Sequence, residues 1–141
     1  MRYFWDTSAA INAAVSSNVW AWLNKDEHAA RLHLFSEFFS TMTGRGIAAV
    51  NSKGEPVRVV FDGADAAQWL RQFAGRVELV ELDGPETLSG LDAAQGRNVQ
   101  GSRVYDYGHA LAAIKAGADV VLTRNEEHFS GLTGTVKVER P

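Results

Sequence analysis

Apolar residues recur along the chain in two spacings, and the two spacings alternate. Short, mostly apolar runs are typical of buried strands. They are followed by stretches in which apolar residues return every three or four positions, as on one face of a helix. The clearest example lies towards the C-terminal end, where Ala110, Ala113 and Ile114 are helically spaced and Val120 to Leu122 is strand-like. Gly117 lies between them, where glycine commonly ends a helix.

The same pattern divides the whole chain into strands and helices. Strands are predicted over Arg2 to Trp5, Ala29 to Phe35, Val77 to Leu82, Val120 to Thr123 and Val136 to Val138. Helices are predicted over Ala9 to Ala14, Val19 to Leu23, Ser36 to Met42, Asp62 or Gly63 to Phe73, Asp83 to Gly96, and from just before Asp106. Two further runs around the turn-rich NSKGEP predict a β-hairpin near 47–61.

Strands that alternate with helices are typical of a mainly parallel sheet with helices on both faces. We therefore expect an α/β fold in three layers, formed by a single domain over residues 1–141, with the hairpin as an addition to that plan. The chain has 141 residues, of which 45% are hydrophobic and 22% charged, so it is long enough to bury a sizeable core.

Composition excludes some classes of protein. The chain has no cysteine, so it can form neither disulfides nor thiolate zinc sites. Asp6 and Asn12 interrupt the apolar residues near the N-terminus, and no apolar run approaches the length of a membrane span. We therefore expect a cytoplasmic protein without a membrane association.

The formal net charge of −3 argues against a protein that coats nucleic acid by charge alone, since such domains are usually strongly basic. It does not exclude a nuclease. A cluster of carboxylates lowers the net charge while divalent ions neutralise it locally, so net charge understates the attraction for phosphate.

Four oxygen-bearing side chains are predicted at one edge of the sheet. Asp6 ends the first strand, Glu37 lies in the first turn of the helix after the second, Asp106 opens a late helix, and Asn125 follows the strand that ends at Thr123. The carboxyl ends of parallel strands form the ligand-binding edge of such sheets. Taken singly, Asp6 and Asp106 are also ordinary helix-start residues and Glu37 an ordinary solvated one. Their matching positions favour a shared site.

Carboxylate and amide oxygens are hard ligands that suit Mg²⁺ or Mn²⁺. The histidines show no zinc-type spacing, and His109, one turn after Asp106, either faces the site or has the commoner role of a packed or exposed residue. The chain lacks a phosphate-binding loop, a dinucleotide-binding glycine pattern and a nucleophile elbow, and it has Ser8 where aspartyl phosphoryl-transfer enzymes have a second aspartate. Metal-assisted phosphodiester hydrolysis is the chemistry that remains.

Three stretches of the chain resemble the PIN-domain family, and most closely the VapC-type toxins of bacterial toxin-antitoxin pairs. They are FWDTSA at Phe4 to Ala9, FSEFFSTMTGRG at Phe35 to Gly46, and the long segment from Arg97 to Phe129, which is the most specific. The resemblance implies a Rossmann-like α/β/α fold and an Mg²⁺- or Mn²⁺-dependent endoribonuclease that acts on tRNA, rRNA or mRNA. It also implies a cognate antitoxin protein that blocks the site, and we expect a homodimer.

The resemblance assigns the site residue by residue. Asp6, Glu37 and Asp106 match the three metal-binding acids of the family, and Asn125 occupies the fourth position, where aspartate is common. Asparagine binds metal through its carbonyl oxygen but adds no charge, so a second ion would be held weakly or only together with RNA phosphate. Further candidates are Thr7 and Thr123, which could orient ligands or water, and the neighbouring Glu126.

Our mechanistic hypothesis is that Asp6 and Asp106 hold a metal ion while Glu37 positions the attacking water or accepts its proton. Four arginines that flank these motifs are candidates for phosphate contacts, although each is also an ordinary solvated residue: Arg45, Arg97, Arg103 and Arg124. Four aromatic residues could line a groove for an antitoxin helix, although core packing is the simpler interpretation: Trp20, Trp22, Phe38 and Phe39.

Two alternatives stay open at this stage. The hairpin near 47–61 could serve dimerisation, antitoxin contact or RNA positioning. The rival to an enzyme is a catalytically weak module of the same fold that binds protein or RNA, and the neutral Asn125 is the feature in its favour.

Overall fold

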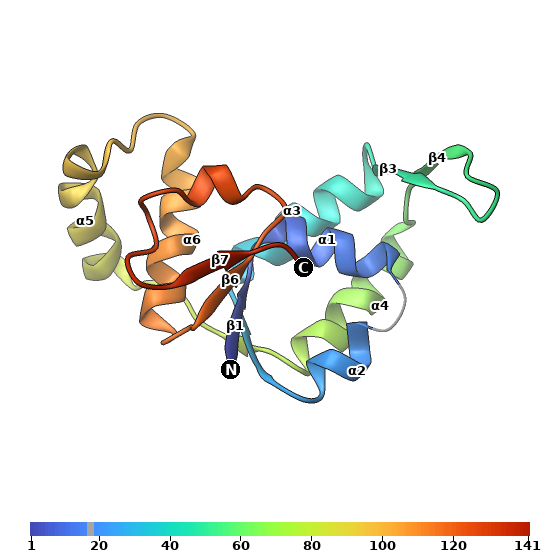
Figure 1. Ribbon diagram of the computed structural model, residues 1–141, viewed down its shortest axis with the longest axis horizontal. Coiled ribbons are helices and arrows are strands. Elements are labelled where there is room, and N and C mark those ends of the chain that lie inside the picture. The colour runs from blue at the N-terminus through green and yellow to red at the C-terminus, as the bar shows by residue number, and fades with distance from the viewer. Residues whose placement is uncertain (17–18) are drawn as a thin grey trace.

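A five-stranded parallel sheet forms the centre of the protein in the computed structural model, which describes residues 1–16 and 19–141 (Figure 1). Its strands lie in the order β5-β2-β1-β6-β7. Their bounds are β1 Arg2–Trp5, β2 Glu27–Ala30, β5 Glu78–Leu79, β6 Val120–Leu122 and β7 Lys137–Glu139. The N-terminal strand β1 pairs with β2 on one side and β6 on the other, so the chain departs from β1 in both directions. Such a switch point is where α/β sheets bind ligands.

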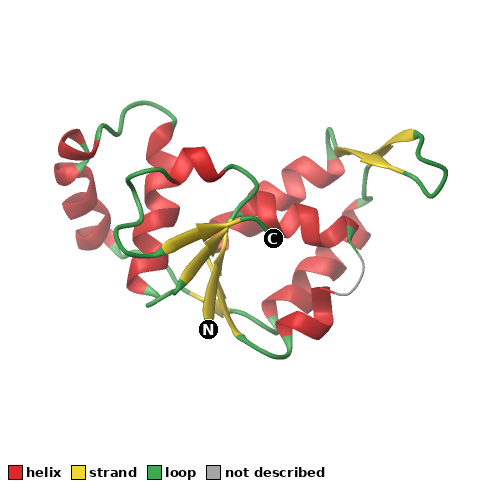
Figure 2. Ribbon diagram, in the orientation of Figure 1, coloured by secondary structure: helices red, strands yellow, loops and turns green. Residues whose placement is uncertain are grey.

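Helices cover both faces of this sheet, which makes three layers (Figure 2). On one face lie α1 Thr7–Val15, α2 Val19–Leu23, α3 Leu32–Thr43 and α4 Gly63–Ala74. On the other lie α5 Gly84–Ala93 and α6 Arg103–Lys115, with the short 3₁₀ helices η1 Gln95–Arg97 and η2 Glu126–Phe129 in the connections. The predicted α/β fold and its layers are therefore confirmed.

Strand alternation divides the buried side chains between two cores. Trp5 packs on the α1 to α4 side and Phe4 on the α6 side, and Leu122 and Val121 of β6 divide in the same way. The first core is aromatic: the ring of the fully buried Phe38 stacks on Trp69, with centroids 4.8 Å apart. Alanines of α6 supply much of the second core, which lets that helix lie close to the sheet.

The predicted positions of the second strand and of the helix after it along the chain are wrong. The strand is β2, Glu27–Ala30, instead of Ala29 to Phe35, and α3 begins at Leu32 instead of Ser36. Glu81, from the chain after β5, explains the difference, because its carboxylate accepts a hydrogen bond from the Leu32 N–H at 2.9 Å and pairs with Arg31. This cap comes from a residue far away in the sequence, so local pattern did not reveal it. Glu37 consequently lies in the second turn of α3.

Other local predictions hold. Asp62 and Asp83 cap their helices, the latter in a capping box with Glu86. Gly117 follows α6 with φ +66° and ends it as expected. Only Glu78–Leu79 of the predicted strand over 77–82 pairs with the sheet. The last strand, β7, lies one residue later than predicted.

The predicted hairpin is present and separate from the central sheet. It consists of β3 Ile47–Val50 and β4 Pro56–Val59, and it projects beyond the ends of α3 and α4 (Figure 1). Gly46, with φ +65°, begins it, and a Cβ there would lie 2.1 Å from the Val59 carbonyl oxygen, so the close approach requires glycine. In the described part of the chain, no helix is long and apolar enough to cross a membrane.

Candidate metal centre

Asp6 directly follows the central strand β1, at the edge of the sheet where a site was predicted. It occupies the N-cap position of α1, but its side chain makes no capping hydrogen bond. Oδ2 instead accepts hydrogen bonds from the hydroxyls of Ser8 and Thr123, each at 2.8 Å. The side chain is buried, so the ordinary capping interpretation of Asp6 does not hold.

The hydroxyl of Thr123 links Asp6 to the Asn125 loop. Thr123 is fully buried at the end of β6, and its Oγ1 accepts the Asn125 N–H at 3.0 Å while donating to Asp6. The Ser8 hydroxyl likewise accepts the Arg124 N–H at 2.9 Å. Residues separated by more than one hundred positions are thus held together by two hydroxyls. Asp6 Oδ1 is left facing the histidine described next.

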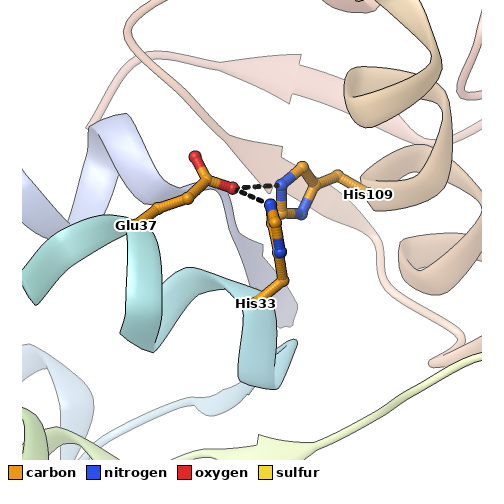
Figure 3. Close-up of side chains that lie close together, drawn as sticks. All are labelled: His33, Glu37 and His109. Carbon is orange, nitrogen blue, oxygen red and sulfur yellow. Dashed lines mark ion pairs between the residues drawn. The ribbon is translucent and has the colours of Figure 1, made fainter. Parts of the chain in front are cut away.

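The carboxylate of Glu37 points toward two imidazoles, those of His33 and His109, as Figure 3 shows. His33, one turn earlier on α3, places Nε2 2.5 Å from Glu37 Oε1, and His109 of α6 places Nε2 3.5 Å from the same oxygen. Burial of the carboxyl opposes its ionisation, but the hydrogen bond from His109 and the charges of both imidazoles outweigh that effect. The pKa of Glu37 is therefore lowered.

His109 joins Glu37 to Asp6. Its side chain is only 3% exposed, and Nε2 lies 4.0 Å from Asp6 Oδ1 as well as near Glu37. Its Nδ1 is buried and has no hydrogen-bond partner among the described residues. His109 is thus a buried, packed residue that also lies close to two of the predicted acids.

Asp106 lies in the first turn of α6, as predicted, and its carboxylate borders the same region. Burial raises the pKa of the Asp106 carboxyl, and the nearby Asp6 carboxylate adds to this rise. His128, whose Nδ1 lies 3.7 Å from Asp106 Oδ2, opposes it together with His109 and Arg103. The shift has the sign expected when two acids share a site, and it is opposite to that of Glu37.

The predicted acids are neighbours without forming one tight group. Among the described residues, a set of three with all ligand atoms within 4.8 Å of one another occurs at His33, Glu37 and His109. Asp6 and Asp106 are not members of this set. The sequence analysis did not single out His33, although its spacing of four from Glu37 is the signal that two residues share a helix face.

The predicted arginines divide into two pairs. The charge of Arg103 acts to lower the pKa of Asp106, and its guanidinium donates to the Ser130 carbonyl at 2.8 Å. The exposed Arg124 donates a hydrogen bond to Asn12 of α1. Arg45 lies past the end of α3 next to the hairpin, and Arg97 is an exposed residue of η1. Arg103 and Arg124 therefore lie near the predicted acids, whereas Arg45 and Arg97 lie farther from them.

Core packing is the correct interpretation for most of the predicted groove aromatics. Phe38 is fully buried, and Trp20 and Trp22 pack against the first core. Phe39 is 42% exposed and lines a hollow of about 570 Å³ between α3 and α4.

Known proteins resemble this chain in structure but not detectably in sequence. No protein-family model matches the chain, and no curated protein matches it in sequence. Solved structures do match over the whole length. The VapBC2 structure from Rickettsia felis, bound to a DNA fragment from its promoter, is similar with a TM-score of 0.62 and 15% identity over 99% of this chain and 98% of that one. VapBC-1 from nontypeable Haemophilus influenzae is similar with a TM-score of 0.58 and 14% identity, over the same shares.

The chain has the PIN-domain fold. This confirms, at the level of the fold, the family resemblance seen in the sequence. In this structure Asp6 follows β1, Glu37 lies on α3 and Asp106 lies in the first turn of α6.

The residues at the β1 edge fit a hard divalent ion. The predicted donors, the carboxylate oxygens of Asp6 and Asp106 and the amide oxygen of Asn125, are of the kind that suits Mg²⁺ or Mn²⁺. Thr7 Oγ1, next to Asp6, is buried without a hydrogen-bond partner among the described residues. Such a buried oxygen calls for a partner, which water at the site or the nearby Glu37 carboxylate can supply.

Proposed function

We propose that the protein is a metal-dependent endoribonuclease that hydrolyses RNA phosphodiester bonds and acts as the toxin of a toxin-antitoxin pair. The observation that carries this proposal is the way the Asp6 carboxylate is held and oriented. Its Oδ2 is held by two hydroxyls from different elements, and its Oδ1 faces the region bordered by Glu37 and Asp106. A carboxylate used only for helix capping would have turned to the α1 backbone instead.

Asp6, Asp106 and Asn125 are the residues that would hold Mg²⁺ or Mn²⁺. The chemistry such an ion supplies when bound is Lewis-acid activation of water and stabilisation of charge on the phosphate. Ser8 and Thr123 orient Asp6 so that one defined oxygen faces the site. Thr7 Oγ1 is placed to hydrogen-bond water there.

Glu37 is suited to positioning water. A general base works best when its pKa lies near the working pH, whereas that of Glu37 is lowered and leaves an ionised, weakly basic acceptor. An ionised carboxylate can accept a hydrogen bond from the attacking water and fix its direction. Of the two roles considered for Glu37, positioning therefore has the better support.

Arg103 and Arg124 are the best placed of the four arginines to bind the RNA backbone, because they border the acids. Arg45 and Arg97 would act on flanking nucleotides. Guanidinium groups bind phosphate in a bidentate manner, which would offset the net charge of −3 locally.

A cognate antitoxin is the proposed protein partner, supported by the match to two VapBC structures over 99% of the chain. The hollow between α3 and α4, with Phe35, Phe39 and Leu70 in its lining, suits the apolar face of an antitoxin helix. We further propose a homodimer and a cytoplasmic location.

The test is cleavage of total bacterial RNA by the purified protein with Mg²⁺ or Mn²⁺, followed by sequencing of the new 5′ ends. We expect defined cleavage that stops with chelator and in Asp106→Asn. Persistent cleavage in the variant would contradict the site assignment.

The rival function, a catalytically weak binding module, is favoured by one observation, the neutral Asn125. Asn125→Asp separates the two. If the natural protein does not cleave RNA and this variant does, the fourth ligand has been lost and the rival is correct.

A further inference from the structure

Two imidazoles and one carboxylate converge beside the acidic site (Figure 3). His33 and Glu37 lie one turn apart on the same face of α3, and His109 reaches them from α6. The three ligand atoms, His33 Nε2, Glu37 Oε1 and His109 Nε2, all lie within 4.8 Å of one another. One point in space is therefore within reach of three donors from two elements.

The distances are close to those of a coordination site. Ligand atoms of a tetrahedral zinc ion, each about 2.0–2.2 Å from the metal, lie about 3.3–3.6 Å from one another. The separation of 3.5 Å between His109 Nε2 and Glu37 Oε1 already meets this. The separation of 2.5 Å from His33 Nε2 to Glu37 must open by about 1 Å.

One histidine of the trio is held in place and the other can move, so the site can adjust its distances to a bound ion. The His109 side chain is 3% exposed and held by the core, whereas the His33 side chain is 43% exposed and can move. The Tyr105 ring lies nearly parallel to the His33 ring, with the two centroids 6.3 Å apart. The solvent side of Glu37 leaves room for water as a fourth ligand.

This donor set differs in kind from the neighbouring one. Asp6, Asp106 and Asn125 offer oxygens only, whereas two imidazole nitrogens with one carboxylate suit Zn²⁺, Co²⁺ or Ni²⁺ over Mg²⁺. We propose that His33, Glu37 and His109 form a second metal site, for a borderline divalent ion such as Zn²⁺.

The two sites share Glu37, which has a functional consequence. A carboxylate oxygen drawn to a zinc ion between His33 and His109 is withdrawn from the water-positioning role in the acidic site. Zinc bound here therefore inhibits the Mg²⁺-dependent reaction. This consequence rests on the proposed nuclease function, whereas the site itself does not.

Zinc binding tests the site without RNA. The metal-free protein is titrated with Zn²⁺ against a chromophoric chelator, and Co²⁺ is added separately as an absorbing probe of tetrahedral coordination. We expect His33→Ala to weaken Zn²⁺ binding at least about tenfold and to remove the Co²⁺ absorption. His128→Ala is the matched control, because it removes another exposed histidine next to an acid but outside the trio, and it should bind as the natural protein does.

His109→Gln provides a second test, with its fold checked by circular dichroism, since this residue is buried. Absence of Zn²⁺ binding by the natural protein, or equal binding by His33→Ala, would overturn the site. In cleavage assays at constant Mg²⁺, Zn²⁺ should inhibit the natural protein at lower concentration than His33→Ala. Equal inhibition would overturn the proposed consequence. If no RNA is cleaved, the nuclease proposal fails, and Zn²⁺ binding still decides the site.

Discussion

The two halves of the candidate centre are built in different ways. The oxygen half, formed by Asp6, Ser8, Thr123 and Asn125, lies where β1 and β6 end. Its register is set by the sheet, in which Trp5 pairs with Leu122. The imidazole half, formed by His33, Glu37 and His109, joins α3 on one face of the sheet to α6 on the other, so its geometry depends on the spacing within α3 and on how both helices pack on the sheet. Strand register thus fixes the first half, whereas the second depends on where two helices begin and how they lie against the sheet.

The largest effect is expected from breaking the oxygen half. Asp6→Asn keeps the side-chain shape but removes the charge that would hold the ion. We expect RNA cleavage to fall by more than about 100-fold, since even the loss of a supporting residue around a metal costs about 10–100-fold. Asp92→Asn on the exposed surface of α5 is the control and should cleave normally. Comparable activity in Asp6→Asn would show that β1 does not carry the site.

A smaller effect is expected when the oxygen half is loosened instead. Thr123→Val keeps the volume of this fully buried side chain but removes the hydroxyl that donates to Asp6 Oδ2. Affinity for Mn²⁺, measured by electron paramagnetic resonance, should fall about 10–100-fold. Thr123→Ser retains the hydroxyl and should retain the affinity. Equal loss in both variants would assign the effect to packing.

The imidazole half can be loosened through the start of α3. Glu81→Ala removes the carboxylate that accepts the Leu32 N–H and pairs with Arg31. The cap should contribute about 0.5–2 kcal/mol to the free energy of unfolding, measured with urea. Glu81→Gln retains an acceptor for the helix and should lose less. Zn²⁺ binding should weaken in Glu81→Ala while Mn²⁺ binding does not, if the two halves are independent.

The smallest expected effects are on thermal stability, and they distinguish the Glu37 carboxyl from the Asp106 carboxyl in the metal-free protein. The folded pKa of Glu37 is lowered, so its ionised form stabilises the protein above the carboxyl's ordinary pKa of 4.5, and this contribution is lost as pH falls through the folded value. The folded pKa of Asp106 is raised, so its ionisation costs stability as pH rises from 3.8 through the folded value.

At pH 7, Glu37→Gln should therefore lower Tm and Asp106→Asn should raise it. Both differences should shrink as the pH is lowered through the folded and unfolded pKa values of each carboxyl, since the group is then protonated in both states. Thermal unfolding at pH 7 and at a series of lower pH values measures this. Shifts of the same sign in both variants would show that the two carboxyls have similar environments.

The oxygen half was predictable from sequence because its residues follow strands directly. Short apolar runs located β1 and β6, and parallel pairing then placed Asp6 near Thr123 and Asn125. The hydroxyl of Ser8 was overlooked, because nothing local indicates which partner a serine hydroxyl takes.

The imidazole half was not predictable in the same way. Glu81 caps α3 from fifty residues away, so the helix begins earlier than its own sequence suggests and His33 becomes helical. The approach of His109 to Glu37 follows from the packing of α3 and α6 on the sheet, which local spacing does not encode. The spacing of four between His33 and Glu37 was the one available signal.

Anomalous diffraction from crystals soaked separately in Mn²⁺ and Zn²⁺ tests the central claim most directly, because it locates each ion among the side chains. We predict a Mn²⁺ peak bounded by the carboxylates of Asp6 and Asp106, and a Zn²⁺ peak bounded by His33, Glu37 and His109. A Mn²⁺ peak away from Asp6, or both ions at one position, would contradict the division of the centre into two halves.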